Sequence, residues 1–334
     1  MTIANRPRVT IGMPVYNAAS LLASALDSLL AQTYANFALV ISDNASTDDT
    51  EVICRDYAAR DARIRYVRQE VNRGSTSNFN AVFELSDTEF FKWAAYDDLC
   101  QPTYLQRCVE VLDQNSDVLW VHSRSRHIDV RGELLLGEET PEISYVNADK
   151  NETANDDVDR SHPTRASQRA SDRFRSVLLG RDGCLDSYGL IRSAVLRKTG
   201  LYVPYFGSEK VLMAELGLWG RYFEIPETLF FARIHPNAAG SQRTSRLQRL
   251  FINPRAGQSW RFSRLQLLRA YAAAVRRSKL GFPERARCYA AISHYVFQIH
   301  KWKSVVLKTL TGAGLAGEYP SVPAGQKQCA PKGC

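Results

Sequence analysis

Apolar and polar residues alternate with two different periods over the first 120 residues. Apolar runs of strand length predict buried strands at residues 9–15, 37–41, 63–68 and 89–94. Between these runs, apolar residues recur every three or four positions, as on one face of a helix, in segments that begin near Leu21, Ser46 and Ser75. This order of elements is typical of βαβ units, so we expect an α/β fold built on a parallel sheet.

Polar side chains follow three of these strands at the point where each strand ends. Asp43 follows the second strand, Asn72 and Arg73 follow the third, and Asp97 and Asp98 follow the fourth. Because ligands of open α/β sheets bind outside the carboxyl ends of the strands, we expect these side chains to line one site. Two adjacent carboxylates are costly there unless a cation meets them, and their oxygens suit Mg²⁺ or Mn²⁺ carrying a diphosphate. The alternative interpretation of these aspartates is that they are helix N-caps.

The rest of the chain is less regular. The polar stretch at residues 137–171 predicts a flexible loop beside the same sheet edge. The pattern then predicts a strand that enters a helix, an apolar helix and a β-type run, at residues 188–196, 211–218 and 228–234. Beyond residue 243 the pattern is helical, and the Pro-, Gly- and Lys-containing tail at 311–334 is expected to be disordered.

Composition narrows the class of protein. The chain has 334 residues, of which 45% are hydrophobic and 23% charged. This composition is typical of an ordinary globular protein with a sizeable core. Its seven cysteines show no C-x-x-C spacing, which favours free thiols in a reducing compartment. The first eight residues contain no apolar signal core, and no apolar run approaches the roughly 18 residues of a membrane span. We therefore expect a cytoplasmic protein.

Positive charge is concentrated near the C-terminus. Residues 243–308 contain fifteen Lys and Arg and a single acidic residue, Glu284, whereas the whole chain carries a net charge of only +8. This asymmetry indicates an anionic partner for the C-terminal part, with a membrane leaflet and nucleic acid as the two candidates.

Several motifs in a fixed order resemble the inverting glycosyltransferases of family 2, which have the GT-A fold. The resemblance covers about residues 8–240 and rests on PVYN at 14–17, SDNASTDDT at 42–50, NRG at 72–74, YDD at 96–98, FGSEKVLMAEL at 206–216 and RIHP at 233–236. It implies a Rossmann-like nucleotide-binding mixed sheet flanked by helices over residues 1–242. The nucleotide-sugar half would cover about 1–122 and the acceptor half about 172–242, and residues 243–310 would form a basic helical extension.

The resemblance also assigns roles to the residues at the sheet edge. Asp43 matches the acid that receives the nucleotide base. The other nucleotide contacts that it implies are Pro14, Tyr16, Asn17, Asn72, Arg73 and Asp97. Arg233 would contact the pyrophosphate.

The same resemblance implies which residues bind the metal ion and which residue is the general base. Asp98 and Asp97 match the last two acids of the D-x-D-D metal signature, but Ala95 stands at its first acid. A missing acid is compatible with Mg²⁺ binding, because this ion keeps several of its waters and needs only one or two protein ligands. His235 is a further candidate metal ligand, with a structural histidine as the alternative. Glu209 matches the general base, although the family more often has Asp there, and a plain first-turn helix acid is the alternative.

The leading functional hypothesis is therefore a metal-assisted transferase that builds cell-surface polysaccharide or glycolipid. Its substrates would be a nucleoside-diphosphate sugar as donor and a saccharide or lipid-linked molecule as acceptor. Its basic helices would lie on the anionic cytoplasmic leaflet, which we favour over nucleic acid as their partner. A nucleotidyltransferase would need a glycine-rich basic loop after the first strand, which residues 13–17 do not provide. A degenerate sugar- or nucleic-acid-binding module is the non-catalytic alternative. The GAGLAG motif at 312–317 follows a basic helix and no strand, so we reject a dinucleotide site there.

Overall fold

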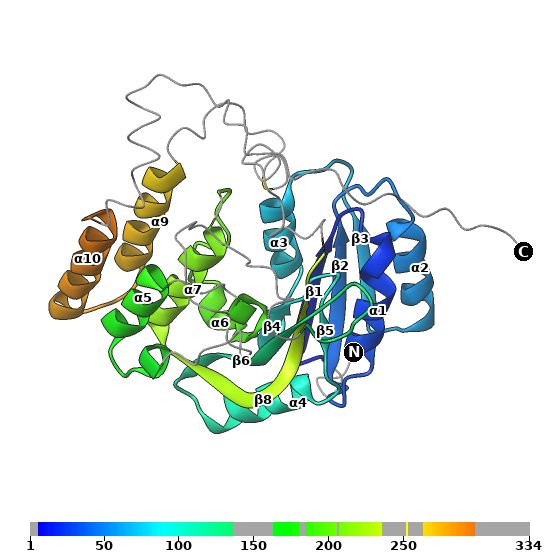
Figure 1. Cartoon of the computed structure of the whole chain (residues 1–334), viewed down its shortest axis with the longest axis horizontal. Coiled ribbons are helices and arrows are strands. Elements are labelled where there is room, and N and C mark those ends of the chain that lie inside the picture. Colours follow the sequence, from blue (N-terminus) through cyan, green and yellow to red (C-terminus); the bar gives the residue numbers. More distant parts are fainter. Residues whose placement is uncertain are drawn as a thin grey trace, which may run out of the picture. The chain divides into compact units, whose positions relative to one another are not determined.

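The structure of the chain is a computed structural model that describes residues 6–135, 163–180, 185–205, 207–235, 252 and 263–297 (Figure 1). The described strands form one eight-stranded sheet in the order β3-β2-β1-β4-β7-β6-β8-β5. Their bounds are β1 Val9–Val15, β2 Phe37–Asp43, β3 Ile64–Arg68, β4 Phe90–Trp93, β5 Leu99–Cys100, β6 Val118–Ile128, β7 Leu190–Arg192 and β8 Arg221–Arg233. Strands β1 to β4 are parallel, and antiparallel pairing of β7 with β4 and β6 makes the sheet mixed.

Helices cover both faces of this sheet (Figure 1). They are α1 Ala19–Leu30, α2 Thr50–Arg60, α3 Ser75–Glu84, α4 Tyr104–Gln114, α5 Ala170–Leu179, α6 Ser193–Leu196, α7 Ser208–Trp219, α9 Ser263–Arg277 and α10 Phe282–Phe297, with 3₁₀ turns at Pro163–Ala166 and Leu185–Tyr188. Phe90 packs with the helices of one face and its neighbour Phe91 with those of the other, because successive strand residues point to opposite sides. The strands of this buried sheet are therefore apolar on both faces, as the sequence pattern indicates.

The four strands predicted in the first 120 residues are confirmed, with ends that agree within two residues. The β-type run predicted at 228–234 is part of a longer strand, β8, which begins at Arg221. Pro226 explains why the predicted strand begins too late in the sequence. The pairing of β8 with β6 shifts register between Ile225 and Thr228, on either side of this proline. Proline is tolerated within a strand at such a bulge, since no ladder hydrogen bond is required there.

The loop predicted at 137–171 is wrong at its C-terminal end. A 3₁₀ turn covers Pro163–Ala166, and α5 begins at Ala170. Polar residues start this helix: Ser167 Oγ donates to Asp172 Oδ2 at 3.1 Å and accepts from the Arg169 backbone N–H at 3.1 Å. Polar residues such as Ser and Asp are common at helix starts as well as in loops. The composition of this segment therefore resembled that of a loop. Residues 137–162 of the predicted loop lie outside the described residues.

The predicted C-terminal helices are present as α9 and α10. Residues 1–295 form one compact unit, so α9 and nearly all of α10 belong with the sheet. The boundary predicted at residue 242 and the tail 311–334 lie outside the described residues. Within the described ranges, no helix combines the length and the apolar character needed to cross a bilayer.

Candidate functional site

The loops that leave β1 and β2 are tied together at the carboxyl edge of the sheet. The Asn17 backbone N–H donates to Ser46 Oγ at 3.0 Å, and the Thr47 backbone N–H donates to Asn17 Oδ1 at 2.8 Å. Asn17 has φ 50°, a left-handed conformation that asparagine tolerates better than most residues. The Ala18 backbone N–H donates to Thr50 Oγ1 at 2.8 Å. Asn17, predicted to line the nucleotide pocket, is thus also the residue that joins the two loops.

Pro14 and Tyr16 lie at the end of β1 and directly after it, and they differ in exposure to solvent. Pro14 is buried inside β1, where it pairs in register with Ser42. Tyr16 follows the strand directly, and 38% of its surface is exposed. Of these two residues, Tyr16 therefore offers an exposed ring on which a base could stack.

Asp43 ends β2 with its carboxylate fully buried and ionically paired. Its Oδ1 accepts from the Ser46 backbone N–H at 2.8 Å, and its Oδ2 accepts from Tyr66 Oη and Arg68 Nη1, each at 2.7 Å. Burial and the hydrogen bond to Asp43 raise the pKa of Tyr66. Sequence reasoning missed this cluster, although the pairing of adjacent strands puts Arg68 opposite Asp43.

Asn72 and Arg73 form the turn that precedes α3. Asn72 Oδ1 accepts from Asn44 Nδ2 and from the Gly74 backbone N–H, both at 2.8 Å, and the Arg73 backbone N–H donates to Asn44 Oδ1 at 2.9 Å. Gly74 has φ 86°, which an L side chain rarely adopts. The Asn72 amide is thus committed to the turn, whereas the Arg73 side chain is exposed.

A further buried amide, Asn78 of α3, was not found from the sequence. Its Nδ2 donates to the carbonyl oxygens of Val15 at 3.3 Å and Ser42 at 2.9 Å, and its Oδ1 accepts from Ser42 Oγ at 2.6 Å. It therefore holds the ends of β1 and β2 at a fixed spacing. The available signal was its position four residues before Val82, on the buried face of the predicted helix.

The acid pair after β4 meets the end of β8. His235 Nε2 lies 2.8 Å from Asp97 Oδ2, and the Arg233 backbone N–H donates to Asp98 Oδ1 at 2.9 Å. Burial, together with repulsion from the Asp97 carboxylate, raises the pKa of Asp98 well above its ordinary value. Of the three residues predicted to hold a metal ion, His235 thus contacts Asp97, whereas Asp98 is held by the backbone of Arg233.

The Arg233 guanidinium has a different environment from the one predicted. It is 6% exposed, and it donates to the backbone carbonyl oxygens of Asp97 at 2.7 Å, Asp129 at 2.9 Å and Val130 at 2.8 Å. These bonds tie the 129–130 turn to the acid pair. A side chain committed in this way is a clamp for the acid pair, so we do not include it among the phosphate contacts.

Glu209 lies in the first turn of α7, two residues after Gly207, which has φ 87°. Burial raises the pKa of its carboxyl. The segment that leads into this helix is anchored on β4 and α3: the Tyr202 ring lies 4.9 Å from that of Trp93, and Tyr202 exchanges two backbone hydrogen bonds with the Asn80 amide at 2.9 and 3.1 Å. Trp93 is the last residue of β4, so the anchor lies at the carboxyl end of that strand.

Other buried acids of this half are already paired. Glu215 of α7 is bound by the Arg277 guanidinium at 2.7 and 2.8 Å and by the Gly200 backbone N–H at 3.0 Å. Asp186 forms a buried ion pair with Arg165. Neither carboxylate offers a free base, which leaves Glu209 as the candidate.

Comparison with known proteins agrees with this geometry. Residues 10–175 match the description "Glycosyl transferase family 2". These residues form a family 2 glycosyltransferase domain. An uncharacterized glycosyltransferase of Rickettsia typhi is 36% identical over 115 residues, which is 34% of this chain and 35% of that protein. The chain therefore spans well under two thirds of the length of this relative.

Solved structures share the fold of the family 2 domain. Staphylococcus aureus TarS 1–349 in complex with UDP-GlcNAc superimposes with a TM-score of 0.59 at 14% identity, over 90% of this chain and 76% of that one. A mannosyltransferase from Pyrobaculum calidifontis in complex with GDP-Man and Mn²⁺ gives 0.51 at 17% identity, over 93% and 77%. The fold is GT-A, as the resemblance implied.

The acid pair Asp97 and Asp98 of the family 2 domain suits a metal ion that is also held by the substrate better than one held by protein ligands alone. Within the described ranges, no three His, Cys, Asp or Glu side chains converge as a metal cage. Asp98 Oδ2 accepts no hydrogen bond from a described residue, and Asp97 Oδ2 lies beside His235. One or two carboxylate oxygens suit an ion such as Mg²⁺ that substrate phosphates and waters also hold.

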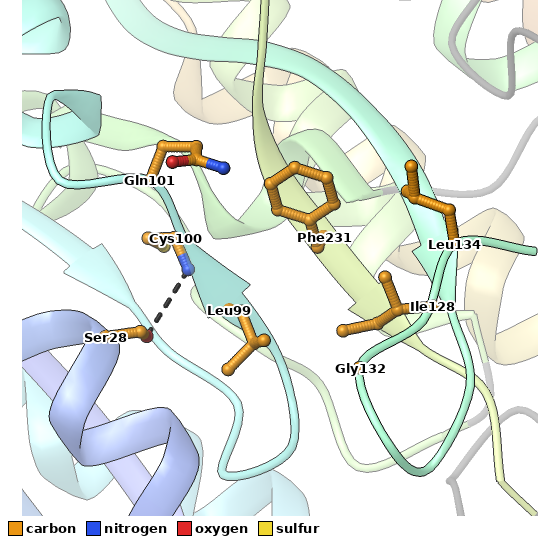
Figure 2. A pocket seen from close by; sticks show the side chains of 8 residues that line it. All are labelled: Ser28, Leu99, Cys100, Gln101, Ile128, Gly132, Leu134 and Phe231. Atoms are coloured by element: carbon orange, nitrogen blue, oxygen red, sulfur yellow. Dashed lines mark hydrogen bonds between the residues drawn. The ribbon is translucent and has the colours of Figure 1, made fainter.

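A hollow of about 320 Å³ lies beyond the acid pair, between β5, the end of β6 and β8 (Figure 2). Leu99, Ile128, Leu134 and Phe231 give it apolar walls, and none of its lining residues is charged; the others are Ser28, Cys100, Gln101 and Gly132. In Figure 2 the Cys100 backbone N–H donates to Ser28 Oγ, at 3.3 Å. A wall without charge does not suit a diphosphate, so we do not assign the nucleotide to this hollow.

Proposed function

We propose that the chain is an inverting glycosyltransferase that transfers a sugar from a nucleoside-diphosphate sugar to a hydroxyl of a saccharide or lipid-linked acceptor, for cell-surface polysaccharide or glycolipid synthesis. The observation that carries the proposal is the acid pair Asp97 and Asp98 of the family 2 domain, in which Asp97 is held by His235 and Asp98 by the Arg233 backbone N–H. Ligands of open α/β sheets bind outside the carboxyl ends of the strands. The nucleotide sugars bound by TarS and by the mannosyltransferase support this class of donor.

The nucleotide would bind over the β1 and β2 ends. Tyr16 offers an exposed ring for stacking, and the Asp43, Tyr66 and Arg68 cluster offers polar groups for the base. Arg73, whose side chain is exposed, is the proposed contact for the phosphates, because a guanidinium matches phosphate geometry.

Asp98, with Asp97 and His235, would hold Mg²⁺ or Mn²⁺ on the diphosphate side. Such an ion, when bound, neutralises the charge that develops on the departing nucleoside diphosphate. Arg233 and the 129–130 turn keep the acid pair in place through hydrogen bonds to backbone oxygens. A cation bound beside Asp98 would oppose the effects of burial and of Asp97 that raise its pKa.

Glu209 is the proposed general base. Its raised pKa brings the carboxylate closer to the basicity needed to take a proton from an acceptor hydroxyl at neutral pH. The hydroxyl oxygen then attacks the anomeric carbon from the face opposite the leaving diphosphate, so the configuration inverts in one displacement.

The test is donor turnover with a panel of UDP-, GDP-, CDP- and dTDP-sugars, measured as release of the nucleoside diphosphate with Mg²⁺, Mn²⁺ or EDTA. Binding of each nucleotide is measured separately by calorimetry. We expect one nucleotide class to bind and turn over in wild type, and Glu209→Gln to bind it without turnover. Binding without any turnover in wild type would favour the degenerate sugar-binding module that Ala95 suggests. Failure of every nucleotide to bind would overturn the proposal.

A further inference from the structure

The two C-terminal helices differ in how much of their apolar surface is buried. Helix α9 packs against α7, its residues Tyr271, Ala274 and Val275 are buried in the core, and Arg277 at its end binds Glu215 (Figure 1). Its apolar face is thus used by the fold. Within the described residues α9 therefore has a structural role.

Helix α10 presents a second face outward. Only Cys288 and Ala291 are fully buried, whereas Phe282 is 85% and Tyr289 37% exposed. Phe282, Ala286, Tyr289 and Ser293 are all exposed, and they follow one another at spacings of four, three and four residues. Residues at these spacings share one side of a helix. We call this side, residues 282, 286, 289 and 293, the outer face of α10.

Exposed basic residues lie close to the outer face along the chain. Arg276, Lys279, Arg285 and Arg287 are exposed at the end of α9 and along α10. The single acidic residue of this region, Glu284, is engaged by the Ser171 backbone N–H at 2.8 Å and by Arg287 Nη1 at 2.6 Å. The outer face therefore combines exposed aromatic rings with an excess of positive charge.

We infer that the outer face of α10 docks on an anionic lipid bilayer surface. This inference builds on the proposed function, because a lipid-linked acceptor would lie at such a surface. A helix with aromatic residues on one side and arginine or lysine beside them lies in the membrane interface, where the rings enter the headgroup boundary and the cations pair with anionic lipid. Each basic residue near such a surface contributes about 1 kcal/mol, or about fivefold in binding.

The direct experiment uses the full chain and sedimentation with vesicles of phosphatidylcholine alone or mixed with phosphatidylglycerol. We expect at least tenfold tighter binding to the anionic vesicles. The double variant Phe282→Ser/Arg285→Gln should weaken that binding at least fivefold, because one charge and one ring are lost. The matched control is Val52→Ser/Arg55→Gln on α2, where Val52 is 67% exposed and the Arg55 side chain 64% exposed. It should change binding by less than twofold.

Circular dichroism and the thermal midpoint check that each variant is folded. Equal binding to neutral and anionic vesicles, or equal effects of the two double variants, would overturn the inference. So would a dimer that Phe282→Ser dissociates, or tighter binding to a single-stranded oligonucleotide than to anionic vesicles. Donor turnover in vesicle-free buffer should not change in Phe282→Ser/Arg285→Gln. Failure of vesicle binding therefore leaves the transferase proposal standing, and failure of turnover leaves the membrane inference standing.

Discussion

His235 Nε2 lies 2.8 Å from Asp97 Oδ2, although 138 positions separate the two residues in the chain. Both side chains are buried, with 7% of His235 and 8% of Asp97 exposed. The contact joins the end of β8 to the turn after β4, where the Tyr96 ring also lies 6.4 Å from the imidazole. A histidine that orients a carboxylate in this way fixes which of the carboxylate's oxygens faces outward.

His235→Ala should therefore weaken both the fold and the site. Loss of the imidazole leaves a buried carboxylate oxygen without its partner, at a cost of about 1–3 kcal/mol in the free energy of unfolding. We expect a similar loss, about tenfold, in nucleotide affinity measured with Mn²⁺. His235→Gln separates the two roles, because the amide keeps a hydrogen-bond donor but removes the imidazole. Full recovery of Mn²⁺-dependent affinity in His235→Gln would show that His235 orients Asp97 and does not bind the ion.

Glu209→Gln should lower turnover about a hundredfold or more while nucleotide binding persists, which is the usual scale for a general base. The same variant should stabilise the fold at neutral pH. Because the pKa of Glu209 is raised in the folded state, the folded protein holds the proton more strongly than the unfolded chain. Its contribution therefore favours folding at low pH and is lost as the pH rises from about 4.5 through the raised value.

Denaturant unfolding of wild type and Glu209→Gln at pH 4 and pH 7 measures this difference. The gap in stability between the two should be larger at pH 7. A gap that does not change with pH would remove the raised pKa as its cause, and near-normal turnover in Glu209→Gln would remove the base role.

Arg277→Met should destabilise the protein by about 2–3 kcal/mol. Removing one partner of a fully buried ion pair costs about 3–5 kcal/mol. We expect a smaller cost here because the Arg277 side chain is 39% exposed, although that of Glu215 is only 1% exposed. The neighbouring Arg276→Met, which removes an exposed charge of the same helix, should cost less than about 0.5 kcal/mol. Denaturant unfolding compares the two. Adding Glu215→Gln to Arg277→Met should restore part of the loss, and equal costs for the two single arginine variants would contradict this interpretation.

Local patterns were sufficient to predict the first half of the fold. Strand and helix periods gave β1 to β4 and the helices between them, because these elements are buried on both faces or on one clear face. The two-residue strand β5 has too few residues to show a period, and it forms only because Leu99 and Cys100 pair with Phe231 and Phe230 of β8. Such strands depend on contacts that a local pattern does not contain.

The sequence indicated at which strand ends the candidate residues lie, but not which residues they contact. The edge of the sheet that collects Asp43, Asp97 and Asp98 follows from strand order alone. The partners of those acids come from elsewhere: Arg68 reaches Asp43 through strand register, and His235 reaches Asp97 through the fold of β8. Arg233 shows the consequence, because a contact with the pyrophosphate was predicted for it, whereas in the structure its guanidinium donates to three backbone oxygens.

Lys92 leads to the last prediction. It is fully buried in β4, its Nζ donates to the Trp93 carbonyl oxygen at 3.0 Å, and it lies 5.1 Å from the Tyr104 ring and 5.7 Å from the Phe230 ring. Its positive charge lowers the pKa of Asp98, against the larger opposing effects of burial and of Asp97. Lys92→Met keeps the length of the side chain and removes the charge, so the pKa of Asp98 should rise further.

Because the ionised carboxylate is the form that binds a cation, Lys92→Met should weaken Mn²⁺-dependent nucleotide binding more at pH 6 than at pH 8. The fold itself should change little or gain stability, since an apolar side chain of similar volume replaces a buried charge. Calorimetry at the two pH values, with Lys92→Arg as the charge-retaining control, measures the effect. A loss of affinity that is equal at both pH values, or equal in the two variants, would mean that Lys92 acts through packing and not through its charge.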